Sequence, residues 1–154
     1  MAAILPGTYS ARDVNVSFSN PALGINILFG GGAEQGVNEI HVRMTTDRTV
    51  IKVGSDGTPM ISAIPGDQSE IEVQLLQTST AHQLFLSWLN QLIVAANQGD
   101  VSNWATTTCF IQLILNGTSH TCTMVAPTKM PDVPYAAEGA TINWVFKAGQ
   151  IINQ

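Results

Sequence analysis

The segment from Ser69 to Asn97 constrains the fold more than any other part of the chain, because a strand pattern there passes directly into a helix pattern. Over Ser69–Gln77 polar and apolar residues alternate, which is the period of a strand with one buried face. The polar face carries Glu70, Glu72 and Gln74, and the apolar face carries Ile71, Val73 and Leu75. The chain therefore contains a half-buried strand whose exposed side bears two carboxylates.

A helix is predicted directly after this strand. Ser79 or Thr80 can cap its N-terminus, with Gln83 completing a capping box that starts at Thr80, and Gly99 stands where a C-terminal cap belongs. Apolar residues recur along one stripe of the helix, and we expect this stripe to form a helix–sheet core. Its members are Phe85, Trp88, Leu89, Leu92, Ile93 and Ala96. Leu86 and Val94 fall off the stripe and are candidates for contact with a neighbouring subunit.

Most of the remaining chain predicts β-structure. Single strands are expected at Asp13–Ser19, at Ala140–Ala148 and within the glycine-rich segment Leu23–Gly36. Two hairpins are expected, Val37–Thr45 with Thr49–Val53 around Thr46-Asp47-Arg48, and Thr107–Leu115 with Thr118–Ala126 around Asn116-Gly117. Loops are expected over Gly54–Gln68 and Pro127–Gly139. The fold class is mainly β (α+β), a β-sandwich or small barrel with one flanking α-helix.

The two cysteines, Cys109 and Cys122, lie in the two arms of the second hairpin. A two-residue turn at Asn116-Gly117 places Met124 opposite Cys109, so the cysteines lie diagonally to each other. Diagonal neighbours are about 7–8 Å apart, beyond comfortable reach of a disulfide. We therefore expect two reduced and mostly buried thiols.

Composition favours assembly over a freely soluble monomer. The chain has 154 residues, enough for one domain spanning 1–154, and only 11% of them are charged, against roughly 25% in a typical soluble protein. Much of the surface is therefore polar-uncharged or apolar and suited to contact with other subunits. The net charge of −5 argues against a protein that grips nucleic-acid phosphates, which needs clustered Lys and Arg.

No targeting or membrane segment is expected. No apolar run approaches the roughly 18–20 residues that span a bilayer. The segment Met1–Gly7 lacks the basic region and long apolar block of a signal peptide. The expected location is a cytosol, with no membrane partner.

The order of turns, strand and helix resembles the tail tube proteins of contractile-tailed (myovirus-type) bacteriophages, in particular the small "structural protein 3" tube family. The resemblance rests on a turn at Ser55-Asp56-Gly57, a second at Pro65-Gly66-Asp67, the acid-bearing strand and the junction Leu75-Leu76-Gln77-Thr78-Ser79 into the helix. It covers about Val37 to Leu89. It extends to Tyr9–Phe18, where Tyr9-Ser10 precedes Asp13-Val14, and is weaker elsewhere.

The resemblance implies a structural virion protein with the tail tube fold. Six copies would form a ring whose inner strands close a common barrel, and rings would stack into the conduit for DNA ejection. Implied partners are further copies of the chain, the tail sheath, tape measure, baseplate and tail terminator proteins, and DNA that passes without specific binding. The implied location is the virion tail, after assembly in the host cytoplasm. In such a ring Glu70, Glu72 and Gln74 are candidates to face the lumen, whereas in an isolated domain they would form a solvated strand face.

No catalytic or cofactor site is expected. His41, His82 and His120 are scattered, without the second Cys/His pair or helical His-x-x-x-His that a metal site needs. No serine lies in a Gly-x-Ser-x-Gly motif. Two other functions remain open, the tube of a phage-derived bacteriocin or type VI secretion system, and a soluble β-sandwich binding module. A binding module of this kind would carry aromatic residues exposed on loops, for which Trp104 and Tyr135 are candidates.

Overall fold

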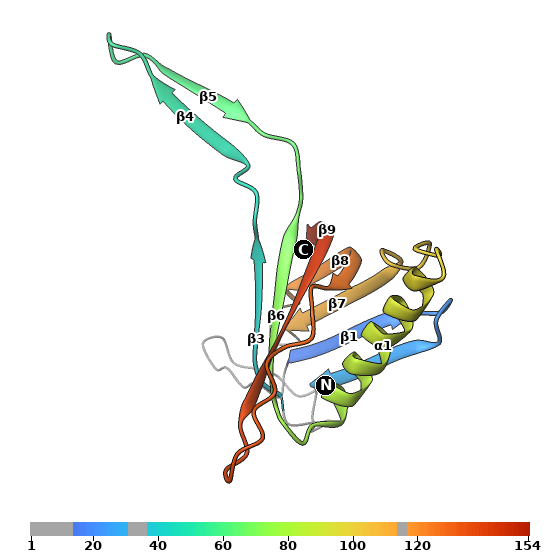
Figure 1. Cartoon of the computed structure of the whole chain (residues 1–154). Coiled ribbons are helices and arrows are strands. Elements are labelled where there is room, and N and C mark those ends of the chain that lie inside the picture. Colours follow the sequence, from blue (N-terminus) through green and yellow to red (C-terminus); the bar gives the residue numbers. More distant parts are fainter. Residues whose placement is uncertain (1–13, 31–36, 114–116) are drawn as a thin grey trace.

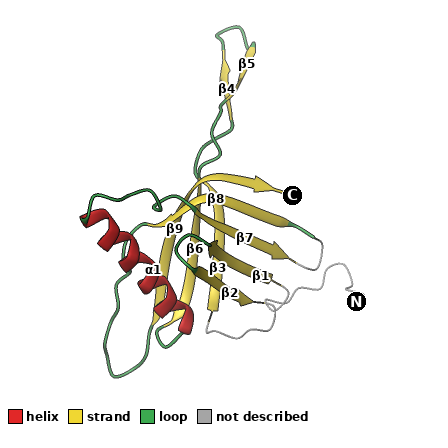
Figure 2. Ribbon diagram, turned by 90° about the vertical axis from the view of Figure 1, so that its right-hand side faces the viewer, coloured by secondary structure: helices red, strands yellow, loops and turns green. Residues whose placement is uncertain are grey.

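The computed structural model describes residues 14–30, 37–113 and 117–154. Seven strands of this part form one antiparallel sheet in the order β2-β1-β7-β8-β9-β6-β3, and β4 and β5 form a separate two-stranded arm (Figure 1). The expected mainly β fold with one helix is confirmed, and it takes the form of a curved sheet with α1 against one face (Figure 2). No helix in these ranges has the length and apolar character needed to cross a membrane. The elements are β1 Val14–Asn20, β2 Ile25–Gly30, β3 Val37–Met44, β4 Thr49–Val53, β5 Pro59–Ala63, β6 Ser69–Leu76, α1 Thr80–Asn97, β7 Thr107–Leu113, β8 Ser119–Pro127 and β9 Thr141–Asn153.

Some expectations fall on other parts of the chain. The Tyr9-Ser10 pair, the start of the first expected strand at Asp13, residues 31–36 of the glycine-rich segment and Asn116 lie outside the described residues.

Strand β9 joins the two halves of the sheet. Its first part, Thr141–Ala148, pairs with β6, and its second part pairs with β8 from Phe146 to Asn153. The sequence pattern predicted a strand that stops at Ala148, but the apolar residues beyond it continue the strand. Gly149 suits this position because it has no side chain and leaves room for Met124 of β8. A Cβ added at Gly149 would lie 2.5 Å from Met124 Cε.

The helix begins and ends as its flanking residues predict. Ser79 is the N-cap, and its side chain accepts a hydrogen bond from the Ala81 N–H at 3.2 Å. Gly99 has φ of +85°, and the amides of Gly99 and Asp100 donate to Ala96 and Ala95. This paired arrangement is a Schellman motif, which glycine favours because it adopts positive φ without strain.

The core lies between α1 and the sheet. Phe85, Trp88, Leu89 and Leu92 are buried, as expected, together with Ala81 and His82. Ile93 was expected in this core and is instead 41% exposed. It lies about 80° around the helix from Phe85, since each residue turns about 100°, so it falls at the edge of the buried stripe. Leu86, expected to face a neighbour, packs partly on the core, and Val94 is exposed.

The expected hairpin between Val37–Thr45 and Thr49–Val53 is wrong. β3 pairs with β6, and β4 pairs with β5, a strand that the sequence pattern left within a loop. The Thr45 amide donates to Gln68 O and the Ile64 amide donates to Arg48 O, so the chain runs straight through Thr46-Asp47-Arg48 without reversing. The reversal comes at Gly54–Thr58, where Gly57 has φ of +86°. β3–β4 and β5–β6 thus form one long, interrupted ribbon (Figure 1).

The second expected hairpin is correct in its strands and wrong in its register. Cys109 lies directly opposite Cys122, because Leu113 and Thr118 already pair across the loop. A β-bulge near Met124, whose φ is +57°, then adds one residue to β8, and beyond the bulge Thr107 pairs with Val125. Both thiols are buried and free, although the diagonal placement from which this was expected is wrong. Burial raises the pKa of each thiol.

Candidate functional site

The polar face of β3, β6 and β9 is the side of these strands that lies away from α1. Directly opposite residues in an antiparallel sheet point to the same face, so the register defines rows of side chains across it. One row is Arg43–Glu70–Lys147, the next is His41–Glu72–Val145, and the third is Glu39–Gln74–Asn143. Glu70, Glu72 and Gln74 therefore share one face, as their alternation predicts, and they lie between two strands that contribute polar and charged residues.

Arg43 contacts both carboxylates of this face. Its Nη2 donates to Glu70 Oε1 at 2.8 Å and to Glu72 Oε2 at 3.0 Å. These hydrogen bonds, the one to Glu70 first, raise the pKa of Arg43 above its ordinary value. The pair Glu39–His41 lies next to them, with His41 Nε2 2.6 Å from Glu39 Oε1.

The charges on the polar face nearly cancel. With His41 neutral, Glu39, Glu70 and Glu72 oppose Arg43 and Lys147, which leaves one net negative charge per chain. The sequence pattern predicted a more acidic face, because it assigned β3 to the wrong partner strand. The alternation of Glu39, His41 and Arg43 was visible in the sequence, but only the pairing of β3 with β6 places Arg43 beside Glu70 and Glu72.

The second candidate surface is the arm, β4 with β5, which extends away from the sheet (Figures 1 and 2). Ile51 lies opposite Ile61, and Val53 lies opposite Pro59, so one side of the arm is apolar. Ile51 and Ile61 are 59% and 68% exposed, and nothing in the described part of the chain covers them. Exposed apolar surface of this kind is typical of sites that contact another molecule.

The base of the arm is held by polar contacts. Arg48 Nη1 donates to Gly66 O at 2.6 Å and lies 2.9 Å from Asp67 Oδ1. Thr46 Oγ1 donates to Gln68 Oε1 at 2.7 Å. These contacts replace strand hydrogen bonds at the interruption between the body and the arm.

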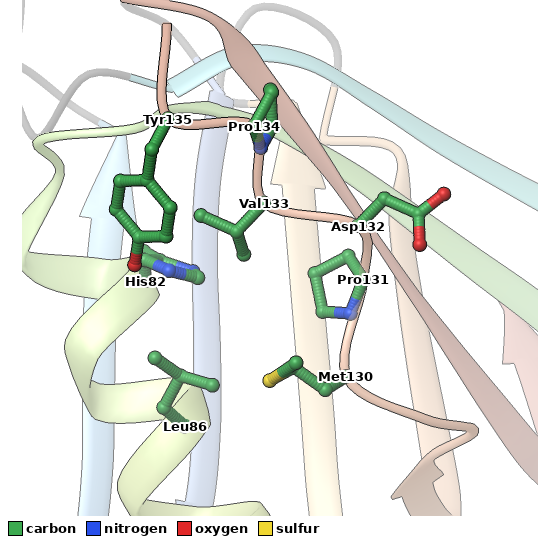
Figure 3. A pocket seen from close by; sticks show the side chains of 8 residues that line it. All are labelled: His82, Leu86, Met130, Pro131, Asp132, Val133, Pro134 and Tyr135. Carbon is green, nitrogen blue, oxygen red and sulfur yellow. The ribbon is translucent and has the colours of Figure 1, made fainter.

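An open groove of about 500 Å³ lies between the start of α1 and the segment 130–135 (Figure 3). His82 and Leu86 line it from the helix, and Met130, Val133 and Tyr135 are among its residues from the facing segment. Gln77 anchors this segment, since its side chain donates to Pro134 O at 2.8 Å and accepts from the Ala140 amide at 3.3 Å.

His82 is the one titratable side chain of this groove that is buried. Its Nδ1 accepts a hydrogen bond from Trp144 Nε1 at 2.9 Å, so that nitrogen carries no proton. Burial lowers the pKa of His82. The residue is thus a neutral acceptor for a core tryptophan.

The described residues contain no group of three or more His, Cys, Asp or Glu side chains that could hold a metal ion. Of the two loop aromatics, Trp104 packs partly on the core and Tyr135 is 91% exposed. One exposed ring does not make the aromatic platform that a binding module would need.

Comparison with known proteins identifies the family. The model of the bacteriophage PhiTE tail tube protein family matches residues 6–154. A search of curated proteins gives no match. A similar solved chain, from the sheath–tube complex of an extracellular contractile injection system (PVC) in the extended state, is 12% identical, with a TM-score of 0.58 over 97% of this chain and 93% of that one. Another, from the 6-fold symmetrised baseplate of the anti-feeding prophage, is 10% identical, with a TM-score of 0.57 over 98% and 97% of the two chains. These two structures share the fold, and because the family model covers nearly the whole sequence, the chain belongs to the bacteriophage PhiTE tail tube protein family.

Proposed function

We propose that this tail tube protein forms six-membered rings that stack into a tube, with the polar face of β3, β6 and β9 lining the channel through which DNA leaves. The observation that carries this proposal is the arm. Its apolar side packs on none of the described residues outside the arm, so it is available to pack on another copy. Because only 11% of the residues are charged, the surface also has few charges that would repel a second copy.

The edges of the sheet support closure of a ring. β3 and β2 are the two ends of the strand order, and each pairs with one neighbour among the described strands. An edge strand presents unpaired N–H and C=O groups, which pair readily with a strand of another chain. Pairing of the β3 edge of one copy with the next copy would continue the sheet around the ring and place the polar face on its inner side.

The lining suits passage of DNA. DNA phosphates bind proteins mainly through Lys and Arg, with release of counterions. The polar face offers two cations among three carboxylates, and one of the cations, Arg43, already contacts two of these carboxylates. The expected channel wall is therefore slightly negative and does not hold the duplex.

The proposed partners follow from the proposal that the chain forms a tail tube. The similar solved chains come from a sheath–tube complex, a sheath/tube terminator and a baseplate. We expect this chain to contact the same three classes of protein in a virion tail, with tape measure protein in the lumen before DNA. The protein has a structural role and catalyses no reaction.

Negative-stain electron microscopy of the purified protein tests the proposal. Rings or tubes with an open centre are the expected result. A compact monomer that persists at high concentration, with no rings or tubes in any field, would overturn it. DNA ejection from particles that carry the protein then separates a phage tail tube from the tube of a bacteriocin or secretion system.

A further inference from the structure

Arg43 occupies an unusual place for a cation in a channel that DNA must cross. Its side chain is 47% exposed on the polar face, so a passing phosphate can reach it. Arginine binds phosphate strongly, because its planar guanidinium offers several N–H donors in a fixed geometry. A lining with one such group in every subunit would therefore hold the duplex, unless something else occupies the guanidinium.

Glu70 and Glu72 occupy one of its three nitrogens and place two negative charges beside the others. One nitrogen of Arg43, Nη2, donates to both carboxylates, at 2.8 and 3.0 Å. The two carboxylates are two residues apart on β6, and Arg43 on β3 reaches both from the neighbouring strand. The three side chains together carry one net negative charge, so a phosphate that approaches Arg43 meets two carboxylates at the same point.

We propose that Glu70 and Glu72 keep the channel free for DNA chiefly by masking Arg43 from phosphates, and that general repulsion by an acidic wall is secondary. This inference rests on the proposed function, since it needs the polar face to line the channel. In this proposal Glu70 and Glu72 affect DNA passage indirectly, by pairing with Arg43. The benefit of keeping Arg43 is structural, because its ion pairs hold the edge strand β3 on β6.

Masking and repulsion are separated by two variants of equal net charge. Glu70→Gln/Glu72→Gln/Asn143→Asp leaves Arg43 in place without its carboxylates, and the added Asp on β9 lies one strand beyond β6. Arg43→Gln/Glu70→Gln/Glu72→Gln removes the arginine as well. Both variants bring the polar face from one net negative charge to neutral, and both leave Lys147 without its opposite carboxylate, so they differ in the unmasked arginine and in the compensating change at Asn143.

The experiment measures DNA ejection from phage particles whose tail tubes carry each variant. If Glu70 and Glu72 mask Arg43, the first variant ejects several-fold more slowly than the second, and added salt relieves the slowing because phosphate contacts weaken with ionic strength. The second variant ejects as the wild type does. Equal ejection by the two variants would overturn masking. Absence of rings and tubes in the wild-type protein would instead overturn the proposed function.

Asp67→Asn is a matched control, since it frees Arg48 from an ion pair of 2.9 Å at the base of the arm and away from the polar face. It should leave ejection unchanged. Variants that fail to assemble are compared as unassembled proteins, by the salt concentration that elutes each from an immobilised DNA duplex. If Glu70 and Glu72 mask Arg43, the variant that keeps Arg43 elutes at a higher salt concentration than the variant without it. Equal elution of the two variants counts against masking.

Discussion

Trp88 belongs to the aromatic cluster between α1 and the sheet. Its ring stacks on Phe146, with centroids 5.5 Å apart and planes 13° from parallel, and it contacts Phe18 at 5.9 Å. Its Nε1 is buried and has no hydrogen-bond partner among the described residues. The residue therefore contributes through packing alone.

Replacing Trp88 with Ala should cost about 3–5 kcal/mol of unfolding free energy, because it empties the largest site of the core. That is a large part of the roughly 5–15 kcal/mol that stabilises a domain. Trp88→Phe should cost much less, since it keeps most of the ring and removes an N–H that makes no hydrogen bond. Chemical denaturation measures both, and a Trp88→Ala protein as stable as the wild type would contradict the packing described.

His82 should make stability depend on pH. Burial lowers its pKa in the folded protein, while the unfolded chain titrates near the ordinary value of about 6.5. As pH falls below that value the unfolded chain binds a proton first, so stability is complete above about pH 6.5 and decreases below it. Protonation would also break the hydrogen bond from Trp144.

The melting temperature of the wild type should therefore fall between about pH 7 and pH 5. His82→Gln should start lower at pH 7 and fall less steeply over this range. Parallel curves for the wild type and His82→Gln would show that another group controls the pH dependence.

The buried and exposed faces of a strand were predictable from the sequence where polar and apolar residues alternate along it. The alternation in β6 correctly separated Glu70 and Glu72 from the buried Ile71, Val73 and Leu75. The partner of these carboxylates was not predictable in the same way, because Arg43 reaches them through a pairing between strands that the sequence pattern had not joined. Ile93 was misplaced because a helical stripe has no sharp edge in the sequence.

At the scale of elements, turn residues misled the interpretation more than strand residues did. Thr46-Asp47-Arg48 and Pro65-Gly66-Asp67 both carry turn chemistry, and both were expected to reverse the chain or lie in a loop. The structure places them opposite each other, where they interrupt a two-stranded ribbon and are joined by Arg48. Turn propensity marks a break in a strand, but it does not say whether the chain reverses there.

The arm should be needed for assembly and not for folding. Ile51→Thr/Ile61→Thr changes a directly opposite pair on its apolar side and keeps β-branched residues, so the arm itself should still form. The melting temperature of the unassembled protein should stay the same, because the arm packs on no part of the described core. Rings and tubes should be lost, as seen by electron microscopy.

Lys52→Thr is the control for this variant, because Lys52 pairs with Met60 on the other side of the arm. It should assemble normally. Normal tubes from Ile51→Thr/Ile61→Thr would mean that the apolar side of the arm is not an assembly surface.

At the scale of the whole molecule, composition and the resemblance to tail tube proteins agreed with the fold and the family. Low charge content indicated assembly without showing where the contacts lie. The surfaces became visible only in three dimensions, where the arm separates from the sheet and β9 joins the two halves of the sheet into one curved layer. A sequence reports which residues alternate, whereas the composition of the polar face depends on the order of the strands.

Cations left unmasked on the polar face should slow DNA passage in the proposed tube. Changing Glu70 and Glu72 to Lys alone would set two lysines against Arg43 and weaken the pairing of β3 with β6, since like charges on opposite strands destabilise a sheet. Adding Arg43→Glu restores attraction between these strands. Glu70→Lys still sets a lysine opposite Lys147 of β9, so the triple variant should fold and assemble with a melting temperature below that of the wild type. The face changes from one net negative to one net positive charge per chain.

In the proposed tube of six-membered rings, this change replaces an arginine that contacts two carboxylates with two lysines that share one, so phosphates meet an unmasked cation on every chain. Each lysine that meets a phosphate releases counterions, so binding of the duplex should be strong at low salt and weak at high salt. We expect tubes of normal appearance in electron micrographs and DNA ejection that is slowed at low ionic strength and recovers as salt is added. The double variant without Arg43→Glu should show a lower melting temperature. Normal tubes with unaltered ejection in the triple variant would place Glu70 and Glu72 away from the channel.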